Sequence, residues 1–573
     1  MCGILVFKSK NLNNELKNKF RSCLNSLKNR GPDDLNIVKN KNLLAGFTRL
    51  SINDIKTGSQ PFVSLCGKYI IVFNGEIVNY NELGQRLNKK NIKMKYGHEA
   101  EVILNLFILY GDKCVEFLRG FFAFVIIETK TNNIHAFVDR FAIKPLYYIE
   151  TNNGELKILT SDYSSLIKNE VIKKELNIQN VGDFFSFGRY FGHHVFKEVK
   201  QIGPGSILKI KGNNKHTVKY WKPFNSESKI ITKNISLQNS IILLSEKLIE
   251  VANSWKLGET NISLCLSTGM DSQIVNYYFN LNNIRKTNFH ISERKKRFIE
   301  PGTHTIDTNL KKTQILFNEF IRESFNPYPL AHGSSTTLFE LYNAISFNNF
   351  KMTFTGEGSD EIMGGYERYR RQLFLLERKK LNFVNMIMET YKKDIQTTEE
   401  NFNNKFAFNF KENLKTRIKK IKLNSQENIN KILEFDQLTF LPAVLQRHDF
   451  IGMHYSLEVR PIFLDHELVE LINQLPVDFK YNLNENKIIL RKLFKLKKGY
   501  DSHKIKIGTP SIFHSMMSNK NEIKNFREAV FYGICQNFLK TEKVIKKIKS
   551  NYKKNDSIFL WRLYVLNKIL YNF

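Results

Sequence analysis

Residues 262–272 have the sequence ISLCLSTGMDS, a short apolar run followed by a turn rich in Ser, Thr, Gly and Asp. The run Ile262–Leu266 predicts a buried strand, and the turn precedes a helix expected from Ser272. Residues 350–361, FKMTFTGEGSDE, repeat this order, with a strand over Phe350–Thr355 before a Gly-rich acidic loop. Strands that alternate with helices predict a parallel α/β sheet. The segments with helical periodicity are 237–254, 336–348, 366–394, 428–450, 464–474 and 558–571.

The two turns after these strands carry polar groups suited to nucleotide chemistry. Ser267–Ser272 can bind phosphate, because N–H groups at a helix N-terminus attract anions. It is not a Walker A loop, since no Gly-Lys-Thr/Ser follows, and taken alone it could be a simple helix cap. The acidic loop 356–361 holds three carboxylates in five residues, which suits a magnesium site or a general base.

The first 205 residues have a different pattern. Short apolar runs broken by turn residues, such as Tyr69–Asn74, Phe121–Glu128 and Ile134–Val138, predict strands, with helices near 12–29 and 99–110. The polar stretch 222–235 lacks periodicity and indicates a linker. We therefore divide the chain into a domain over 1–210, a linker over 211–235 and a domain over 236–573.

Cys2 is a candidate nucleophile. Removal of Met1 would place a thiol and an α-amine on one residue, so that the amine could take up and return the proton. Asn74 and Gly75 could stabilise an oxyanion, although Asn-Gly is also a common hairpin turn. Arg49 could clamp a carboxylate or form a structural ion pair. Glu99 could hold an ammonium group, or it could interact with the helix dipole as an acidic residue in the first helical turn.

Composition excludes several classes of protein. Hydrophobic residues make up 42% of the 573 residues, which is typical of a globular chain, and the longest apolar run is too short to cross a bilayer. The net charge of +32 suggests nucleic-acid binding, but the basic residues are dispersed, and the sequence has no zinc-finger spacing and no RNP-like aromatic motif. The six cysteines are scattered, which argues against zinc or a disulfide framework and favours a reducing cytoplasm.

Several motifs occur in a fixed order in the N-terminal half: Cys2-Gly3-Ile4, Arg30-Gly31-Pro32-Asp33, Arg49-Leu50-Ser51-Ile52, Gln60-Pro61, Phe73-Asn74-Gly75-Glu76-Ile77, Arg119-Gly120-Phe121-Phe122-Ala123-Phe124 and the run Asp139–Tyr148. Together they resemble the class II glutamine amidotransferase domain, an N-terminal-nucleophile sandwich of antiparallel sheets between helices. The resemblance implies that Cys2 attacks the glutamine amide and forms a γ-glutamyl thioester. It assigns the oxyanion to Asn74 and Gly75, the α-carboxylate to Arg49, and the amino-acid end to Glu76 and Glu99. Glu99 replaces the usual Asp.

The C-terminal motifs, from Ser267–Ser272 through Gly356–Glu361 to Ser456–Arg460, Lys487–Arg491 and Trp561–Leu563, resemble the ATP-pyrophosphatase domain of asparagine synthetases. The resemblance implies an acyl-adenylate, amidated by ammonia that arrives through an internal tunnel. It places magnesium on Asp271 and Asp360, the acyl-adenylate near Glu357, and phosphate charge near Lys506. Thr268 replaces a usual Gly, which raises the question of whether the loop needs a positive φ. The implied ATP contacts are Leu266, Ser267, Gly269, Asp271, Ser272, Ile291, Thr355 and Gly356.

The acceptor is the least constrained part of this prediction. The resemblance implies aspartate as the default acceptor. The expected substrates are therefore glutamine, ATP and aspartate, with Mg²⁺ as the metal ion. A homodimer is one possible assembly, and neither nucleic acid nor a membrane is an expected partner. Residues 285–330 depart most from the family pattern, and part of the acceptor pocket is expected there. Another carboxylate, such as a sugar uronate, is therefore the alternative. A glutaminase or binding protein with an inactive ATP site is an alternative of a different class.

Overall fold

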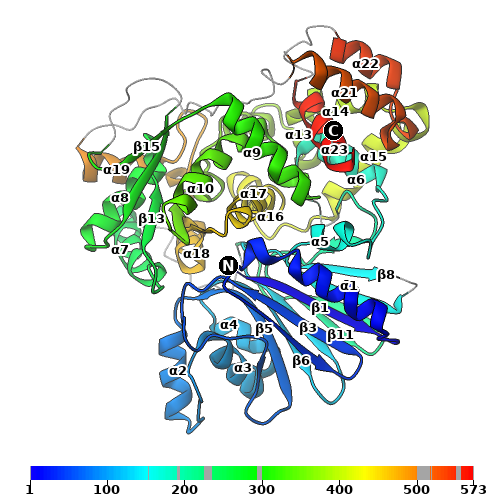
Figure 1. Ribbon diagram of the computed structural model, residues 1–573. Coiled ribbons are helices and arrows are strands. Elements are labelled where there is room, and N and C mark those ends of the chain that lie inside the picture. The colour runs from blue at the N-terminus through cyan, green and yellow to red at the C-terminus, as the bar shows by residue number, and fades with distance from the viewer. Residues whose placement is uncertain are drawn as a thin grey trace.

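The computed structural model describes residues 2–151, 154–189, 191, 194–224, 235–292, 300–499, 517, 519–549 and 557–571. Lys506 lies outside these residues. Figure 1 shows a strand-rich N-terminal domain on one side and a mainly helical domain, with its own sheet, on the other. In the described part of the chain, no helix is both long and apolar enough to span a bilayer.

The N-terminal domain is a sandwich of two six-stranded antiparallel sheets. Apolar side chains from both sheets fill the space between them, among them Val6, Phe47, Val72 and Val125. Helix α1 (Asn14–Asn25) covers the outer face of one sheet, and α2 (Tyr80–Lys89) and α3 (Glu99–Tyr110) cover the other (Figure 1). The first sheet runs β10 (Val199–Gln201), β8 (Tyr147–Thr151), β9 (Leu156–Thr160), β1 (Gly3–Ser9), β3 (Leu43–Arg49), β2 (Asp34–Asn40).

The second sheet runs β12 (Asn214–Lys219), β11 (Ser206–Lys211), β7 (Ile134–Val138), β6 (Gly120–Glu128), β5 (Tyr69–Ile77), β4 (Phe62–Val63). Its central strands β5 and β6 are almost continuously buried, because helices cover one face and the other sheet covers the opposite face. Strand β12 is an exposed edge strand rich in lysine. It pairs with β11 inside the segment 211–235, so the sheet extends into the region that the sequence predicts to be the linker.

The C-terminal domain contains the predicted parallel sheet. All four pairings are parallel, in the order β15 (His304–Asp307), β14 (Thr287–Ser292), β13 (Ile262–Cys265), β16 (Met352–Thr355), β17 (Glu458–Pro461). This confirms the α/β arrangement expected from the strands at 262–266 and 350–355. Helices α7 (Leu237–Trp255), α8 (Met270–Leu281), α18 (His466–Gln474) and α19 (Ile488–Lys498) pack into one apolar core with β13 and β16.

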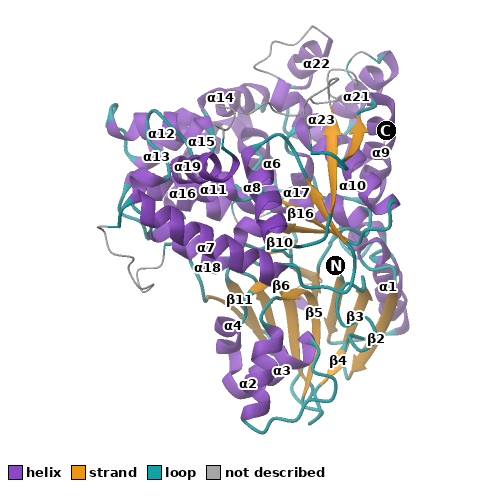
Figure 2. Cartoon of the chain, turned by 90° about the vertical axis from the view of Figure 1, so that its left-hand side faces the viewer, coloured by secondary structure: helices purple, strands orange, loops and turns teal. Residues whose placement is uncertain are grey.

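Two long helices expected from periodicity are interrupted. The segment 366–394 forms α12 (Glu367–Glu377) and α13 (Phe383–Thr390), because Lys380 has φ 52° and Asn382 caps the second helix. The segment 428–450 forms α16 (Asn428–Thr439) and α17 (Leu441–His454), since Pro442 lacks an N–H and starts a new helix. Figure 2 shows the helices of this domain stacked above the strands of the sandwich.

The remaining described helices are divided between the two domains. Near the sandwich lie α4 (Cys114–Phe117), α5 (Ser164–Lys168) and α6 (Ile178–Phe187). The others are α9 (Leu310–Glu323), α10 (Thr337–Phe347), α11 (Ser359–Met363), α14 (Lys392–Asn401), α15 (Asn404–Lys420), α21 (Lys520–Tyr532), α22 (Thr541–Lys549) and α23 (Ser557–Tyr571).

Candidate active sites

Cys2 lies directly before β1, where neighbouring strands hold it in place. Its N–H donates to Asn74 Oδ1 at 2.9 Å, and the N–H of Gly3 donates to Thr48 Oγ1 at 3.2 Å. Burial raises the pKa of the Cys2 thiol, while the backbone N–H of Leu50 and the charge of Arg49 act in the opposite direction. The thiol therefore stays protonated at neutral pH unless a base removes its proton.

Asn74 and Gly75 form part of strand β5 rather than a hairpin turn. Asn74 pairs with Ala123 and Gly75 with Phe122 in the ladder to β6, which makes the hairpin alternative wrong. The Nδ2 of Asn74 is buried and has no hydrogen-bond partner among the described residues. Gly75 has φ 141°, and a Cβ there would lie 2.1 Å from the carbonyl oxygen of Phe121. An unused donor beside an obligate glycine suits an oxyanion site.

Arg49 fixes the loop that closes the site. Its guanidinium donates to the backbone carbonyls of Asn53, Asp54 and Ile55 at 2.6–3.2 Å. This contact is neither the predicted carboxylate clamp nor the alternative ion pair, and it leaves the clamp as a prediction. Cys2, Arg49, Gly75, Glu76 and Glu99 all line one cavity, whose other walls are Leu50, Asn53, Asp54, Gly58, Gln60, Phe73, His98 and Ala100.

Two buried carboxyl groups stand at this cavity. Burial raises the pKa of Glu76 to about 8, with Arg460 acting against the shift and Glu458 adding to it. Burial and repulsion from Glu76 raise the pKa of Glu99 well above its usual range. One oxygen of Glu99 accepts from the N–H of Ile77 at 2.6 Å, whereas Oε2 of Glu76 has no hydrogen-bond partner in the described part of the chain. An ammonium group would satisfy this acceptor and favour ionisation.

The turn Ser267–Ser272 joins β13 to α8 and is closed by its own hydroxyls. The Oγ of Ser272 accepts from the N–H of Ser267 at 2.9 Å, and the Oγ of Ser267 accepts from the N–H of Gly269 at 3.1 Å. Thr268 does not have a positive φ, and Gly269 has φ −74°. Thr268 therefore causes no backbone strain, which answers the question raised by its place in the motif.

Lys487 links the two polar loops, a role that the sequence alone does not reveal. Its Nζ lies 2.6 Å from Oδ1 of Asp271, 2.6 Å from Oδ1 of Asp360 and 2.6 Å from the Oγ of Ser359. The side chain is buried, and its backbone has φ 48°. The sequence shows Lys487 as part of the motif Lys487–Arg491. Only the fold brings it to Asp271 and Asp360, which are more than a hundred positions away in the chain.

The other residues that the sequence predicts to bind ATP lie in or near these loops. A Cβ at Gly356 would lie 2.8 Å from the Cβ of Asp271, so glycine allows the two loops to approach closely. Glu357 Oε1 lies 3.2 Å from Nη2 of Arg447. Thr355 ends β16, and its Oγ1 is buried without a described partner. Leu266 lies directly after β13, and Ile291 lies in the neighbouring β14, near the same edge of the sheet.

Buried ion pairs join the two domains. Arg460 of β17 donates to Glu458 Oε1 at 2.6 Å, and its Nη2 lies 3.4 Å from Glu76 Oε1 in the cavity beside Cys2. Arg30 reaches Asp449 of α17 at 2.9 Å. A line of charged groups therefore runs from the cavity beside Cys2 to the parallel sheet.

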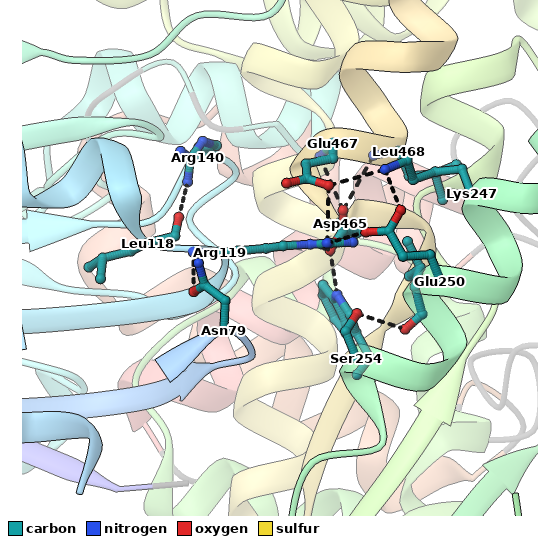
Figure 3. A network of polar contacts seen from close by, with 12 residues as sticks. Asn79, Leu118, Arg119, Arg140, Lys247, Glu250, Ser254, Asp465, Glu467 and Leu468 are labelled. Carbon is teal, nitrogen blue, oxygen red and sulfur yellow. Dashed lines mark hydrogen bonds and ion pairs between the residues drawn. The ribbon is translucent and has the colours of Figure 1, made fainter. Parts of the chain in front are cut away.

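Arg119 makes a second interdomain contact, which Trp255 connects to Arg460, because the backbone carbonyl of Trp255 accepts from Nη1 of Arg460 at 2.9 Å. Figure 3 shows the Arg119 side chain reaching from the sandwich to Glu250 of α7 and to Asp465 and Glu467 at the start of α18. The Arg119 Nε lies 2.8 Å from Oδ2 of Asp465, which also accepts from the Nε1–H of Trp255 at 2.7 Å. Arg119 thus links the sandwich to helices α7 and α18 of the second domain.

Two family models match different parts of the chain. Residues 1–221 match the family model of the glutamine amidotransferase domain, and residues 312–519 match that of asparagine synthase. Asparagine synthetase [glutamine-hydrolyzing] 3 of Bacillus subtilis is 25% identical over 488 residues, which cover 79% of this chain and 77% of that protein. Asparagine synthetase [glutamine-hydrolyzing] 1 of the same organism is 26% identical over 506 residues, covering 78% and 76%. The chain is a divergent member of the family that joins a glutamine amidotransferase domain to an asparagine synthase domain.

Proposed function

We propose that this chain is a glutamine-dependent carbon–nitrogen ligase that amidates a carboxylate with ammonia released at Cys2. The observation that carries the proposal is the presence of two polar sites in one chain. The oxyanion-type pair Asn74 and Gly75 adjoins Cys2, and Lys487 gathers Asp271 and Asp360 at the edge of the parallel sheet. Buried ion pairs hold these sites in one molecule.

The glutaminase reaction uses groups that the fold already places together. We expect the amine of Cys2, once Met1 is removed, to accept the thiol proton, because burial keeps the thiol protonated. The thiolate then attacks the amide carbon of glutamine, and Asn74 Nδ2 and the N–H of Gly75 bind the oxyanion. The ammonium formed on Cys2 returns the proton to the amide nitrogen, which leaves as ammonia, and water then hydrolyses the γ-glutamyl thioester and regenerates the thiol.

The synthetase reaction needs ATP, because a carboxylate offers ammonia no usable leaving group. Asp271 and Asp360 converge on one ammonium group, and two carboxylates with substrate phosphates are a common magnesium site. Magnesium, when bound, would neutralise phosphate charge. Lys487 is positioned to do the same, and the turn at 267–272 can accept phosphate oxygens. Glu357 is proposed to lie beside the acyl-adenylate.

Aspartate is the acceptor that the family suggests, and conversion to asparagine is the form of the proposal to test first. The alternative of an inactive ATP site loses its main argument, because Thr268 causes no strain in the turn. The acidic loop and Lys487 also keep a compact, paired arrangement.

The test measures the products of ATP cleavage with glutamine and a panel of carboxylates. We expect AMP and pyrophosphate, formed only when an acceptor is present. Asp271→Asn and Asp360→Asn should lower this rate by about a hundredfold and leave glutamine hydrolysis intact. ADP and phosphate as products, or an unchanged rate in both variants, would refute the proposal.

A further inference from the structure

Glu357 of the acidic loop contacts two side chains of helix α17 through one of its carboxylate oxygens. The Nε2 of His448 lies 3.1 Å from Oε1 of Glu357, and the Nη2 of Arg447 lies 3.2 Å from the same atom. The Glu357 side chain is 29% exposed, whereas that of His448 is only 7% exposed. Glu357 is therefore accessible to a substrate, and His448 supports it from the protein interior.

Tyr342 of helix α10 extends this contact by one residue. Its hydroxyl lies 2.5 Å from Nδ1 of His448, and its side chain is completely buried in the same apolar core as Phe339 and Ile345. Tyr342, His448 and Glu357 thus form a chain of three hydrogen-bonding groups from this core to the acidic loop. Apolar side chains could pack in the core without the desolvation that buried polar groups undergo, so stability alone does not account for this chain.

The contacts assign the protons of this chain. Burial lowers the pKa of His448, with the charge of Glu357 acting against the shift and that of Arg447 adding to it, so the imidazole is neutral at neutral pH and carries one N–H. An ionised carboxylate oxygen can only accept, so this N–H is the one on Nε2, which faces Glu357. Nδ1 is then an acceptor, and the hydroxyl of Tyr342 donates to it. Arg447 and His448 both donate to Oε1, which explains why Nη2 of Arg447 lies 3.1 Å from Nε2 of His448.

Helix α17 also contacts the N-terminal domain near Cys2. Asp449, the residue after His448, pairs with Arg30 at 2.9 Å, and the Nε of Arg30 lies 3.5 Å from the carbonyl oxygen of Cys2. Consecutive residues of one helix therefore contact Glu357 and the residue beside the proposed nucleophile. This helix thus connects the proposed source of ammonia with Glu357.

We propose that His448, held by Tyr342, is a positioning residue that fixes Glu357 as the proton acceptor in amide formation. The proposal rests on the proposed function. The nitrogen of ammonia bonds to the acyl carbon and becomes positively charged, and Glu357 takes one of its protons. The bond between the acyl carbon and the oxygen of AMP then breaks, and AMP leaves with the electron pair. His448 and Tyr342 act through Glu357 and do not contact the reacting atoms.

The test measures amide formation by the full chain with ammonia as the nitrogen source, so that the site at Cys2 is bypassed. The acceptor is aspartate, or the carboxylate of the panel that the wild-type protein amidates. His448→Leu should lower this rate about ten- to a hundredfold, because a displaced base loses that much. The KM values for ATP and for the acceptor should stay within about twofold, as should the exchange of labelled pyrophosphate into ATP, since neither reports proton transfer from ammonia.

Hydroxylamine as a second nitrogen source distinguishes a positioning role from a merely structural one. It is a weaker base than ammonia, so the nitrogen of its adduct loses a proton more readily and depends less on Glu357. The loss in His448→Leu should therefore be at least about fivefold smaller with hydroxylamine than with ammonia. Equal losses with the two nitrogen sources, or no loss with ammonia, would overturn the inference.

Further variants test the chain of hydrogen bonds itself. His448→Gln keeps an N–H that can reach Glu357 and should restore most of the rate lost in His448→Leu. Tyr342→Phe should lower the ammonia rate by a few-fold in the wild-type background but not in His448→Leu, because the hydroxyl acts through the imidazole. An equal effect in both backgrounds would contradict the chain. Tyr342→Phe removes a single hydroxyl and, with the same comparison of nitrogen sources, tests the proposal if His448→Leu does not fold.

His454→Leu is the matched control. It removes another imidazole of helix α17, which packs against the ring of Phe320, and should leave every rate unchanged. Glutaminase activity verifies folding in all variants. Absence of amide from every carboxylate in the wild-type protein would refute the proposed function itself, whereas amide formation that His448→Leu leaves unchanged would refute only the role of His448.

Discussion

Asn74 uses its two side-chain atoms for two different tasks. Its Oδ1 accepts from the N–H of Cys2, while its Nδ2 stays buried without a described partner. The same residue can therefore orient the proposed nucleophile, Cys2, and leave a donor for an oxyanion. A buried donor without a partner costs about 1–3 kcal/mol, a cost that transition-state binding would recover.

Replacement of the nucleophile should separate the two reactions. Cys2→Ala is expected to abolish glutamine hydrolysis, because no other thiol lines the described cavity. Pyrophosphate release with high concentrations of ammonium should persist, since the second site is untouched. Both activities are measured on the same preparation, and intact glutaminase activity would exclude Cys2 as the nucleophile.

Glutamine binding should strengthen as pH rises from 6 to 8. Burial raises the pKa of Glu76 to about 8 in the free protein, so the carboxyl is mostly protonated at pH 6. We expect the ammonium of glutamine to bind the ionised form, so that binding releases a proton. The dissociation constant should fall by up to about tenfold per pH unit and level off above pH 8.

Calorimetry on Cys2→Ala measures this dependence without hydrolysis and without titration of the thiol. Glu76→Gln in the same background should bind glutamine more weakly and with little dependence on pH. A dissociation constant that is equal at pH 6 and pH 8 in the Cys2→Ala protein would contradict the assignment of Glu76.

At the scale of elements, the second site depends on how closely the end of β16 approaches the start of α8. Gly356 makes this approach possible, because a Cβ would lie 2.8 Å from the Cβ of Asp271 and 3.0 Å from the N of Ser272. The approach places Asp271 and Asp360 on one ammonium group of Lys487.

Gly356→Ala should therefore separate the two loops. We expect pyrophosphate release to fall at least about tenfold, because small displacements of catalytic groups cost that much or more, while glutaminase activity stays unchanged. Gly203→Ala is a control, since a Cβ there would meet nothing closer than 3.8 Å. Equal activity in both variants would show that the close approach is unimportant for synthesis.

The elements that the sequence predicts well are those with strong local patterns. The strands at 262–266 and 350–355 and the helix at 99–110 agree with β13, β16 and α3, because apolar runs and helical periodicity are local properties. The break in 366–394 depends on a positive φ at Lys380, which no periodicity reveals. Long-range positions are harder still: Lys487 becomes part of a site only because α19 packs against α7 and α8.

At the scale of the whole molecule, charged contacts hold the sandwich to the second domain. Arg119 binds Asp465, whose side chain is fully buried, and Arg460 reaches the cavity beside Cys2 from β17. Free ammonia is mostly ammonium in neutral water and is then not nucleophilic. A closed path between the sites would therefore preserve it, and the interface is where such a path would run.

Arg119→Met should weaken this interface. It leaves the carboxylate of Asp465 buried with fewer partners, and loss of one member of a buried pair costs about 3–5 kcal/mol of unfolding free energy. We also expect more glutamine to be hydrolysed for each pyrophosphate formed. Arg86→Met, which removes an exposed pair with Glu82, should cost less than about 1 kcal/mol and leave this ratio unchanged. Identical effects of the two variants would show that the Arg119 contact does not hold the domains.

Transfer of the amide nitrogen tests the account most directly. The protein is given ATP, the accepted carboxylate, glutamine labelled with ¹⁵N in its amide, and an excess of unlabelled ammonium, and the product amide is analysed by mass spectrometry. Coupled sites in one chain predict a product that carries mostly ¹⁵N, with AMP and pyrophosphate formed in step. A product whose nitrogen matches the bulk ammonium, or no amide product from any carboxylate, would contradict a glutamine-dependent ligase.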